Sequence, residues 1–266
     1  MLGDRAHLPV DAALAPFYRC VHVAETGSTN DDAKTLAADG AAEGTLIWAD
    51  RQSAGRGRRG RAWQSPAGNL HMSLILRPAA PLASLGQIGF AAGLAIAEAI
   101  SLLLRSPALV ACKWPNDVLI DGRKVAGLLL ESDGLTEDRR WLVLGIGVNV
   151  ASHPSGVEFP ATSLAAAGRA VPVGDVLSAV CDRFDAWYAV WRGQGFAPLR
   201  AAWLKRAAGL GGPITVRLED RVLDGDFAGL DEDGALLLHS AGPAGGEPRR
   251  VTAGDVFFPA AIAKAG

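Results

Sequence analysis

Residues 85–104 are almost entirely apolar, and the segment is about long enough to cross a lipid bilayer as a helix. It nevertheless carries Gln87, Glu98 and Ser101, and a charged side chain inside a membrane is costly. Hydrophobic residues make up 49% of the chain and charged residues 20%, as in a globular protein with a sizeable core. We therefore expect a buried core helix and no association with a membrane.

Both strand and helix patterns occur in the first 209 residues. Asp121-Gly122 favours the positive φ angles of a two-residue turn, so residues 118–120 and 123–131 are expected to pair as a hairpin. The expected strands are 21–24, 45–49, 70–76, 110–114, 118–120, 123–131 and 141–150, and the expected helices are 30–39, 84–104, 175–191 and 197–207.

The character of the chain changes after the glycine-rich segment 209–213. Short apolar runs at 214–218, 221–227, 235–239 and 249–252 are separated by Asp and Gly turns. Four or five short strands in this length predict a small β-barrel. We place the boundary near residue 210, with a larger domain at 1–209 and a smaller one at 210–266.

Composition also bears on the compartment and on possible partners. Cys20, Cys112 and Cys181 show no metal-ligand spacing, and the first 15 residues lack an apolar signal core, which fits a reducing, cytoplasmic location. The formal net charge is −2 and the pI is about 6.2. A general nucleic-acid-binding domain usually has a pI above about 9, so we expect no nucleic-acid partner.

A cationic loop is the most distinctive local feature. Residues 51–61 contain five arginines and no acidic residue, and glycines between them permit close approach of the backbone to a ligand. Guanidinium groups suit carboxylate and phosphate oxygens, so the loop resembles a clamp for anions. A solvated basic loop without a role and contact with RNA or DNA are the alternatives.

The same loop matches the sequence of a dinucleotide-binding motif but lacks the structural context that this motif requires. Gly55, Gly57 and Gly60 satisfy G-x-G-x-x-G, but that motif requires a following helix and an acidic residue about 20 positions later. Pro66 and Gly68 follow instead, and the residues near position 80 are Pro and Ala. We reject this interpretation.

Lysine is scarce, so the positions of two of the five lysines are informative. Lys113 lies in the run Lys-Trp-Pro-Asn-Asp, and Lys124 follows the hairpin turn, where it should face Leu119 across the two strands. An ordinary solvated lysine is the alternative for Lys124. A loop start after Pro115 is the alternative for Asn116 and its neighbour.

Three further features have structural as well as functional interpretations. The run at residues 28–30 is Ser-Thr-Asn, residue types that cap helices. Gly145 and Gly147 lie in an expected strand, where glycine often marks close approach of a ligand or another backbone. Trp63 is either a core residue or a stacking surface for an aromatic ligand.

Taken in chain order, these motifs resemble those of the biotin protein ligase family. The resemblance covers residues 21–151 densely and is carried by the following runs: Gly27-Ser28-Thr29-Asn30, Gln52, Gly55-Arg56-Gly57-Arg58-Arg59-Gly60-Arg61, Lys113-Trp114-Pro115-Asn116-Asp117, Arg123-Lys124-Val125-Ala126-Gly127 and Gly145-Ile146-Gly147-Val148-Asn149. It implies an α+β fold, with a mixed β-sheet and packed helices as in class II aminoacyl-tRNA synthetases, followed by a small SH3-like barrel.

The resemblance also implies a role for each matching residue. Biotin-binding positions are Ser28, Thr29, Asn30, Gln52, Arg56, Gly57, Arg58 and Lys124. Arg58, Lys113 and Lys124 are the implied catalytic residues. Trp63 resembles the aromatic residue that stacks on adenine, and Asn116, Gly147 and Asn149 are implied at the ATP site. No residue is assigned to a metal, because Mg²⁺ enters with ATP.

The implied activity is formation of biotinyl-5′-AMP from biotin and ATP. Biotin then passes to a lysine of the biotin carboxyl carrier protein of acetyl-CoA carboxylase, with no tightly bound cofactor. A lipoate or octanoate protein ligase is the alternative. Many relatives carry an N-terminal helix-turn-helix domain, whereas about 20 residues precede the first expected strand here, so we expect no DNA-binding repressor role. A monomer and a homodimer both remain open.

Overall fold

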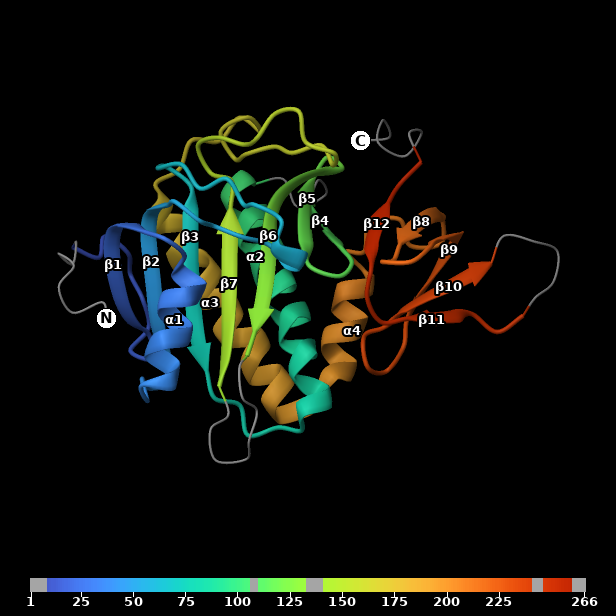
Figure 1. The fold of residues 1–266 in the computed structure, drawn as a ribbon, viewed down its shortest axis with the longest axis horizontal. Coiled ribbons are helices and arrows are strands. Elements are labelled where there is room, and N and C mark those ends of the chain that lie inside the picture. The colour runs from blue at the N-terminus through green and yellow to red at the C-terminus, as the bar shows by residue number, and fades with distance from the viewer. Residues whose placement is uncertain (1–8, 106–109, 133–140, 241–245, 260–266) are drawn as a thin grey trace.

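The structure is a computed structural model that describes residues 9–105, 110–132, 141–240 and 246–259. Its larger sheet has seven strands in the order β1-β2-β3-β7-β6-β5-β4, of which β1 and β2 are parallel and the other neighbours antiparallel (Figure 1). These strands are β1 (Arg19–Thr26), β2 (Thr45–Gln52), β3 (Leu70–Leu76), β4 (Val110–Lys113), β5 (Asp117–Ile120), β6 (Arg123–Glu131) and β7 (Leu142–Val148). The predicted mixed sheet is confirmed.

Helices cover both faces of this sheet. On one face, α1 (Thr29–Ala38) packs over β2, β3 and β7, with Ala33 and Ala37 against Ile47 and Val143. The opposite face carries α2 (Ile88–Leu104) and α3 (Val173–Gln194), followed by α4 (Phe196–Leu204) (Figure 1). Alternation along a strand sends neighbouring side chains to opposite faces, so a strand such as β3 packs against α1 on one face and α3 on the other.

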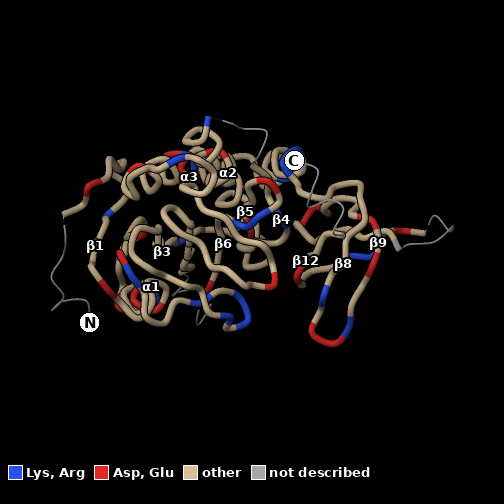
Figure 2. Tube along the Cα trace, turned by 90° about the horizontal axis from the view of Figure 1, so that it is seen from above, with Lys and Arg blue, Asp and Glu red and all other residues tan. Residues whose placement is uncertain are grey.

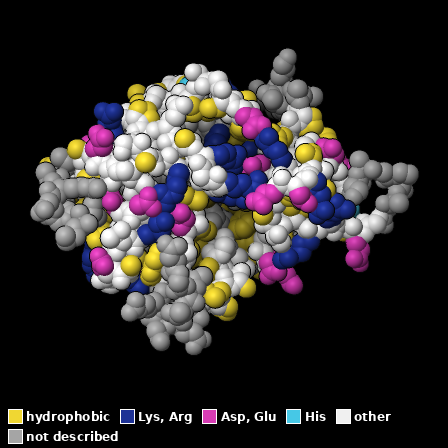
Figure 3. Space-filling model, in the orientation of Figure 1, with side chains coloured by type: hydrophobic (Ala, Val, Ile, Leu, Met, Phe, Trp, Pro, Cys, Tyr) yellow, Lys and Arg dark blue, Asp and Glu magenta, His cyan; other side chains and the backbone are white. Residues whose placement is uncertain are grey.

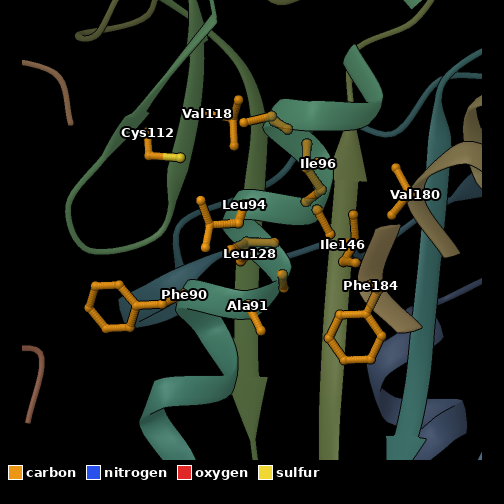
Figure 4. Close-up of a cluster of buried hydrophobic side chains, with 14 of the residues drawn as sticks. Phe90, Ala91, Leu94, Ile96, Cys112, Val118, Leu128, Ile146, Val180 and Phe184 are labelled. Atoms are coloured by element: carbon orange, nitrogen blue, oxygen red, sulfur yellow. The ribbon is translucent and has the colours of Figure 1, made fainter. Parts of the chain in front are cut away.

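The apolar segment forms the core helix that its sequence predicts. A 3-10 helix at Leu82–Gln87 precedes α2, and Leu82–Leu104 is the one helical stretch of the described chain that is long and apolar enough to cross a membrane. Most of this stretch is buried. Side chains from α2, β6, β7 and α3 meet in one cluster that includes Leu94, Leu128, Ile146 and Phe184 (Figure 4).

The β5–β6 hairpin matches the predicted turn and pairing. Asp121 and Gly122 both have positive φ, of 48° and 70°, and Leu119 pairs with Lys124. The register then shifts, because Val118 pairs with Ala126 and leaves one extra residue in β6. A bulge of this kind changes which side chains share a face. Lys124 therefore lies on the same face as Gly127, three residues further along.

The C-terminal segment folds into a second, antiparallel sheet in the order β11-β10-β9-β8-β12. Its strands are β8 (Pro213–Arg217), β9 (Val222–Leu230), β10 (Leu236–Ser240), β11 (Arg249–Val251) and β12 (Asp255–Phe257). β12 was not among the strands named from the sequence. The expected small β-barrel is present as this five-stranded sheet, but it does not close in the described chain, because β11 and β12 are the two edges and do not pair there.

The two sheets share one hydrophobic core. Trp203 of α4 packs edge-on against Phe227 of β9 with ring centroids 6.5 Å apart, and the indole of Trp114 donates to the carbonyl of Gly234 at 3.1 Å. Phe227 belongs to the same buried cluster as the residues of α2 and β6. We propose a domain boundary at residues 209–210, since β8 begins at Pro213.

Candidate active site

A cavity of about 340 Å³ opens on the face of the large sheet that carries α1, and β12 of the small sheet contributes to its wall. Lys and Arg side chains gather around the hollow on this face (Figure 3), although basic and acidic residues are interspersed along most of the chain (Figure 2). Every residue predicted for the site lines this cavity: Ser28, Thr29, Asn30, Gln52, Arg56, Gly57, Arg58, Trp63, Lys113, Asn116, Lys124, Gly147 and Asn149.

One row of paired strand residues forms the floor of the site. Lys113 of β4 pairs with Asp117 of β5, Asp117 pairs with Gly127 of β6, and Gly127 pairs with Gly147 of β7. Directly paired residues point to the same face of a sheet. The sheet thus places two charged residues beside two positions that have no side chain.

Asp117 links the two predicted lysines. Its carboxylate lies 2.6 Å from Nζ of Lys124 and 3.5 Å from Nζ of Lys113. Burial by itself would raise the pKa of Asp117, but the two ammonium groups outweigh it and hold the pKa below its ordinary value. Asp117 is therefore an anion between two cations, a role that the sequence analysis did not assign although the residue belongs to the quoted motif.

Lys113 lies in an aromatic enclosure. Its Nζ is 3.5 Å from the ring centroid of Phe159 and 5.8 Å from that of Phe257 in β12. Burial lowers the pKa of Lys113 and outweighs the opposing effect of Asp117. The cation is stabilised by the ring faces while most of its water is removed.

The two strand glycines of the floor make room for Trp63. A Cβ at Gly147 would lie 2.6 Å from the indole, and one at Gly127 would lie 3.2 Å from it. Nζ of Lys124 lies 5.2 Å from the ring centroid. The sequence predicted close approach at Gly147, and the approaching group is this side chain. Trp63 lines the cavity and is therefore placed for stacking on a ligand, while its Nε1 is buried without a hydrogen-bond partner in the described chain.

A second glycine of β7 accommodates α1. A Cβ at Gly145 would lie 2.2 Å from Oδ1 of Asn30, so only glycine lets this amide reach the strand. Asn30 accepts a hydrogen bond from Oγ of Ser73 at 2.5 Å and donates one to Glu131 at 2.7 Å. The amide is fixed at the end of the cavity away from the lysines.

Gln52 holds the start of α1 from the neighbouring strand. Its Oε1 accepts from the backbone N–H of Thr29 at 2.8 Å and from the Thr29 hydroxyl at 3.0 Å. Ser28 is the N-cap of α1, where its hydroxyl accepts from the backbone of Asp31, so the capping interpretation is confirmed for this residue. Hydroxyl, amide and backbone groups thus gather at one end of the cavity.

Arg56 and Arg58, the two loop arginines predicted to bind biotin, differ in their surroundings. Arg56 donates to Asp31 at 2.7 Å and to Glu131 at 3.0 Å, and the hydrogen bond with Asp31 is the main cause that raises its pKa. Arg58 instead donates to the carbonyl of Gly254 at 3.2 Å, and burial lowers its pKa. Arg58 therefore keeps more of its hydrogen-bonding capacity for a ligand.

Two predicted nucleotide-site residues are also engaged with the fold. Asn116 donates to the carbonyl of Leu128 at 2.6 Å, and its Oδ1 accepts from Arg58 at 3.4 Å. Asn149 donates to the carbonyl of Thr162 at 3.0 Å. No group of His, Cys, Asp or Glu in the described ranges is arranged to hold a metal ion.

Two sequence families match different parts of the chain. The biotin/lipoate A/B protein ligase family matches residues 24–149, and the biotin protein ligase C-terminal domain matches residues 209–258. The chain is 42% identical to the biotin–[acetyl-CoA-carboxylase] ligase of Paracoccus denitrificans, over 89% of this chain and 99% of that protein. It is 37% identical to the bifunctional ligase/repressor BirA of Bacillus subtilis, over 80% of this chain and 67% of that protein.

Solved structures show the same fold. The biotin protein ligase of Aquifex aeolicus in complex with biotin and ATP superposes with a TM-score of 0.76 at 28% identity, over 90% of this chain and 97% of that one. A mixed sheet with packed helices and a cationic cavity places the chain in the class of biotin/lipoate protein ligases. The chain belongs to the biotin protein ligase family, as its motifs predicted.

Proposed function

We propose that the protein activates biotin with MgATP to biotinyl-5′-AMP and then biotinylates a lysine of a biotin carboxyl carrier protein. The observation that best supports this function is that one cavity contains two different groups of side chains. Arg58, Lys113 and Lys124 line one part of it, and polar groups of Thr29 and Asn30 line another. A urea buried at the polar part needs both donors and acceptors. Leaving such groups unpaired would cost about 1–3 kcal/mol each.

In the first step, the biotin carboxylate attacks the α-phosphorus of ATP. A bond forms between a carboxylate oxygen and the α-phosphorus, the bond from this phosphorus to the oxygen that bridges it to the β-phosphate breaks, and pyrophosphate leaves. The carboxylate is already ionised near neutral pH, so the protein need not remove a proton. Repulsion between the two anions opposes the step, and we assign Arg58, Lys113 and Lys124 to offset it by fixed positive charge.

In the second step, the neutral amine of the carrier lysine attacks the acyl carbon of the mixed anhydride. The bond from this carbon to the phosphate oxygen breaks, AMP leaves, and the nitrogen loses one proton to solvent as the amide forms. No protein nucleophile takes part. Arg56, Gly57 and Arg58 would cover the adenylate and keep water away until the carrier arrives. Trp63 is proposed to stack on the adenine, with Asn116, Gly147 and Asn149 beside the nucleotide. Gln52 and Ser28 complete the biotin end.

The acceptor that we propose is the carrier protein of acetyl-CoA carboxylase, the enzyme in the name of the Paracoccus relative. We place the reaction in the cytoplasm, since Cys20, Cys112 and Cys181 are all free. Neither nucleic acid nor a particular oligomeric state is part of the proposed reaction.

The decisive experiment incubates the protein with ATP, Mg²⁺, biotin and a carrier domain, and measures the mass of the carrier. The expected result is a gain of one biotinyl group on its lysine, lost in the carrier variant that lacks this lysine. Lipoate replaces biotin in a parallel reaction. A product with lipoate and none with biotin would overturn the proposal.

A further inference from the structure

The cationic loop is tied to the C-terminal sheet through one carboxylate. Asp255, the first residue of β12, accepts from Arg61 at 2.8 Å, and it lies 3.6 Å from Arg59 and 4.0 Å from Arg58. Its side chain is only 14% exposed, whereas that of Arg61 is 54% exposed. The carboxylate is thus largely enclosed, and the arginines cross from one domain to reach it.

Residues 57–61 at the tip of the loop are linked to one another, so a contact that restrains one of them also restrains the others. Its ends are joined by a hydrogen bond from the backbone N–H of Gly57 to the carbonyl of Arg61 at 2.7 Å. Between them Arg59 has a φ of 55°, a left-handed conformation that makes the turn tight. A contact at Arg61 therefore also fixes Arg58, which lies inside this turn.

The same strand reaches Arg58 and Lys113 directly. The carbonyl of Gly254, just before β12, accepts from Arg58 at 3.2 Å, and Phe257 at its end faces Nζ of Lys113 at 5.8 Å. Residues 254–257 therefore lie against two of the three cationic groups that we assign to the reaction. This segment consists of β12, at the edge of the small sheet, and the residue before it.

We propose that Asp255 is a positioning residue, through which the C-terminal sheet holds the arginine loop closed over the reacting anions. Arg58 lies 4.0 Å from this carboxylate and Arg59 lies 3.6 Å from it, both too far for a hydrogen bond, so the tether acts mainly through the hydrogen bond from Arg61. Arg58 keeps donors for the phosphate, because a guanidinium carries five N–H groups. The inference rests on the proposed function for its kinetic consequence, while the tether itself can be tested without any ligand.

The structural test compares ligand-free wild type with Asp255→Asn, which keeps the shape of the side chain and removes its charge. Amide exchange across residues 55–64 should be about tenfold faster in the variant, the effect expected from losing a hydrogen bond between charged groups. Glu219→Gln is the matched control, since Glu219 lies 3.9 Å from Arg59 but is 85% exposed. Unchanged exchange in Asp255→Asn, or an equal increase in Glu219→Gln, would overturn the proposal.

The kinetic test measures release of biotinyl-5′-AMP and the KM for ATP. Asp255→Asn should release the adenylate about tenfold faster and raise the KM for ATP more than it lowers kcat, while biotin affinity without ATP changes less than twofold. Arg61→Gln should behave in the same way, and the double variant should be no worse than either single variant. Fully additive effects would show that the two residues act separately. Wild type that forms no adenylate would instead refute the proposed function, while the exchange comparison would still decide the tether.

Discussion

Nζ of Lys124 and a carboxylate oxygen of Asp117 lie 2.6 Å apart, in an ion pair that joins β6 to β5 within the cavity. Asp117→Asn should slow adenylate formation at least tenfold, because both lysines lose the anion that places them. It should also lower the free energy of unfolding by about 3 kcal/mol, as expected when one partner of a buried pair is removed. Pyrophosphate exchange and chemical denaturation measure the two effects.

Asp121→Asn is the control for this substitution. Asp121 lies at the tip of the same hairpin with a φ of 48°, a conformation that asparagine adopts readily. The rate of adenylate formation and the free energy of unfolding of this variant should remain close to those of the wild type. If Asp117→Asn matches this control in both measurements, Asp117 does not position the lysines.

The pH dependence of the reaction should reflect Lys113. Burial lowers the pKa of Lys113, so the ammonium group loses its proton below the ordinary lysine value of about 10.4 and adenylate formation falls there. Stability changes in the opposite direction, because the unfolded chain binds more protons between the two pKa values and unfolding becomes less favourable as the pH rises.

Lys113→Arg should remove the alkaline decrease in rate, since a guanidinium stays protonated at the alkaline pH at which a lysine ammonium group loses its proton. The comparison requires the ratio kcat/KM for ATP between about pH 7 and 10 in both proteins. An unchanged alkaline limb in the arginine variant would assign that limb to another group.

Single methyl groups on β7 should separate the two ends of the cavity. Gly147→Ala places a Cβ 2.6 Å from the indole of Trp63 and should weaken ATP binding about tenfold or more, with little change in biotin binding. Gly145→Ala places one 2.2 Å from Oδ1 of Asn30 and should weaken biotin binding by a similar factor. Calorimetry with each ligand alone tests the separation.

Gly193→Ala provides the matched glycine control. This residue lies in α3, and a Cβ there meets nothing within 4 Å. Alanine should stabilise the helix by about 0.5–1 kcal/mol and leave both ligands unaffected. Loss of both ligands in either β7 variant would mean that the cavity responds as one unit.

The loop at residues 55–64 should become more protected when biotin and ATP bind. Arg58→Gly should then weaken retention of the adenylate more than binding of biotin, because Arg58 keeps donors for the phosphate while Arg56 is engaged with Asp31 and Glu131. Amide exchange measures the first effect and calorimetry the second. Arg105→Gly is the control, since Arg105 has a φ of 57° and glycine fits that conformation.

For this loop, two results would contradict the prediction. Exchange that does not change on adding both substrates would show that the loop does not close over the adenylate. Equal losses of adenylate and biotin in Arg58→Gly would show that this arginine does not act on the phosphate.

The sequence alone predicted those structural features that depend on neighbouring residues. The apolar segment predicted the core helix, and Asp121-Gly122 predicted the hairpin that brings Lys124 opposite Leu119. These features depend on periodicity and on the φ angles that a residue tolerates, and both act within a few residues. The resemblance to biotin protein ligases likewise named residues that line the cavity.

Contacts between distant segments had no comparable local signal. Asp255 lies 194 residues from Arg61, and the bulge that turns Lys124 toward Gly127 depends on pairing with β5. Gly145 and Gly147 were expected to meet a ligand or a backbone, but each faces a side chain from another segment. Periodicity and turn chemistry set the helices and turns. The partner of each charge was decided only when the two sheets packed together. An ion pair depends on the distance between two charges in space, so it requires no regular separation of the two residues along the sequence.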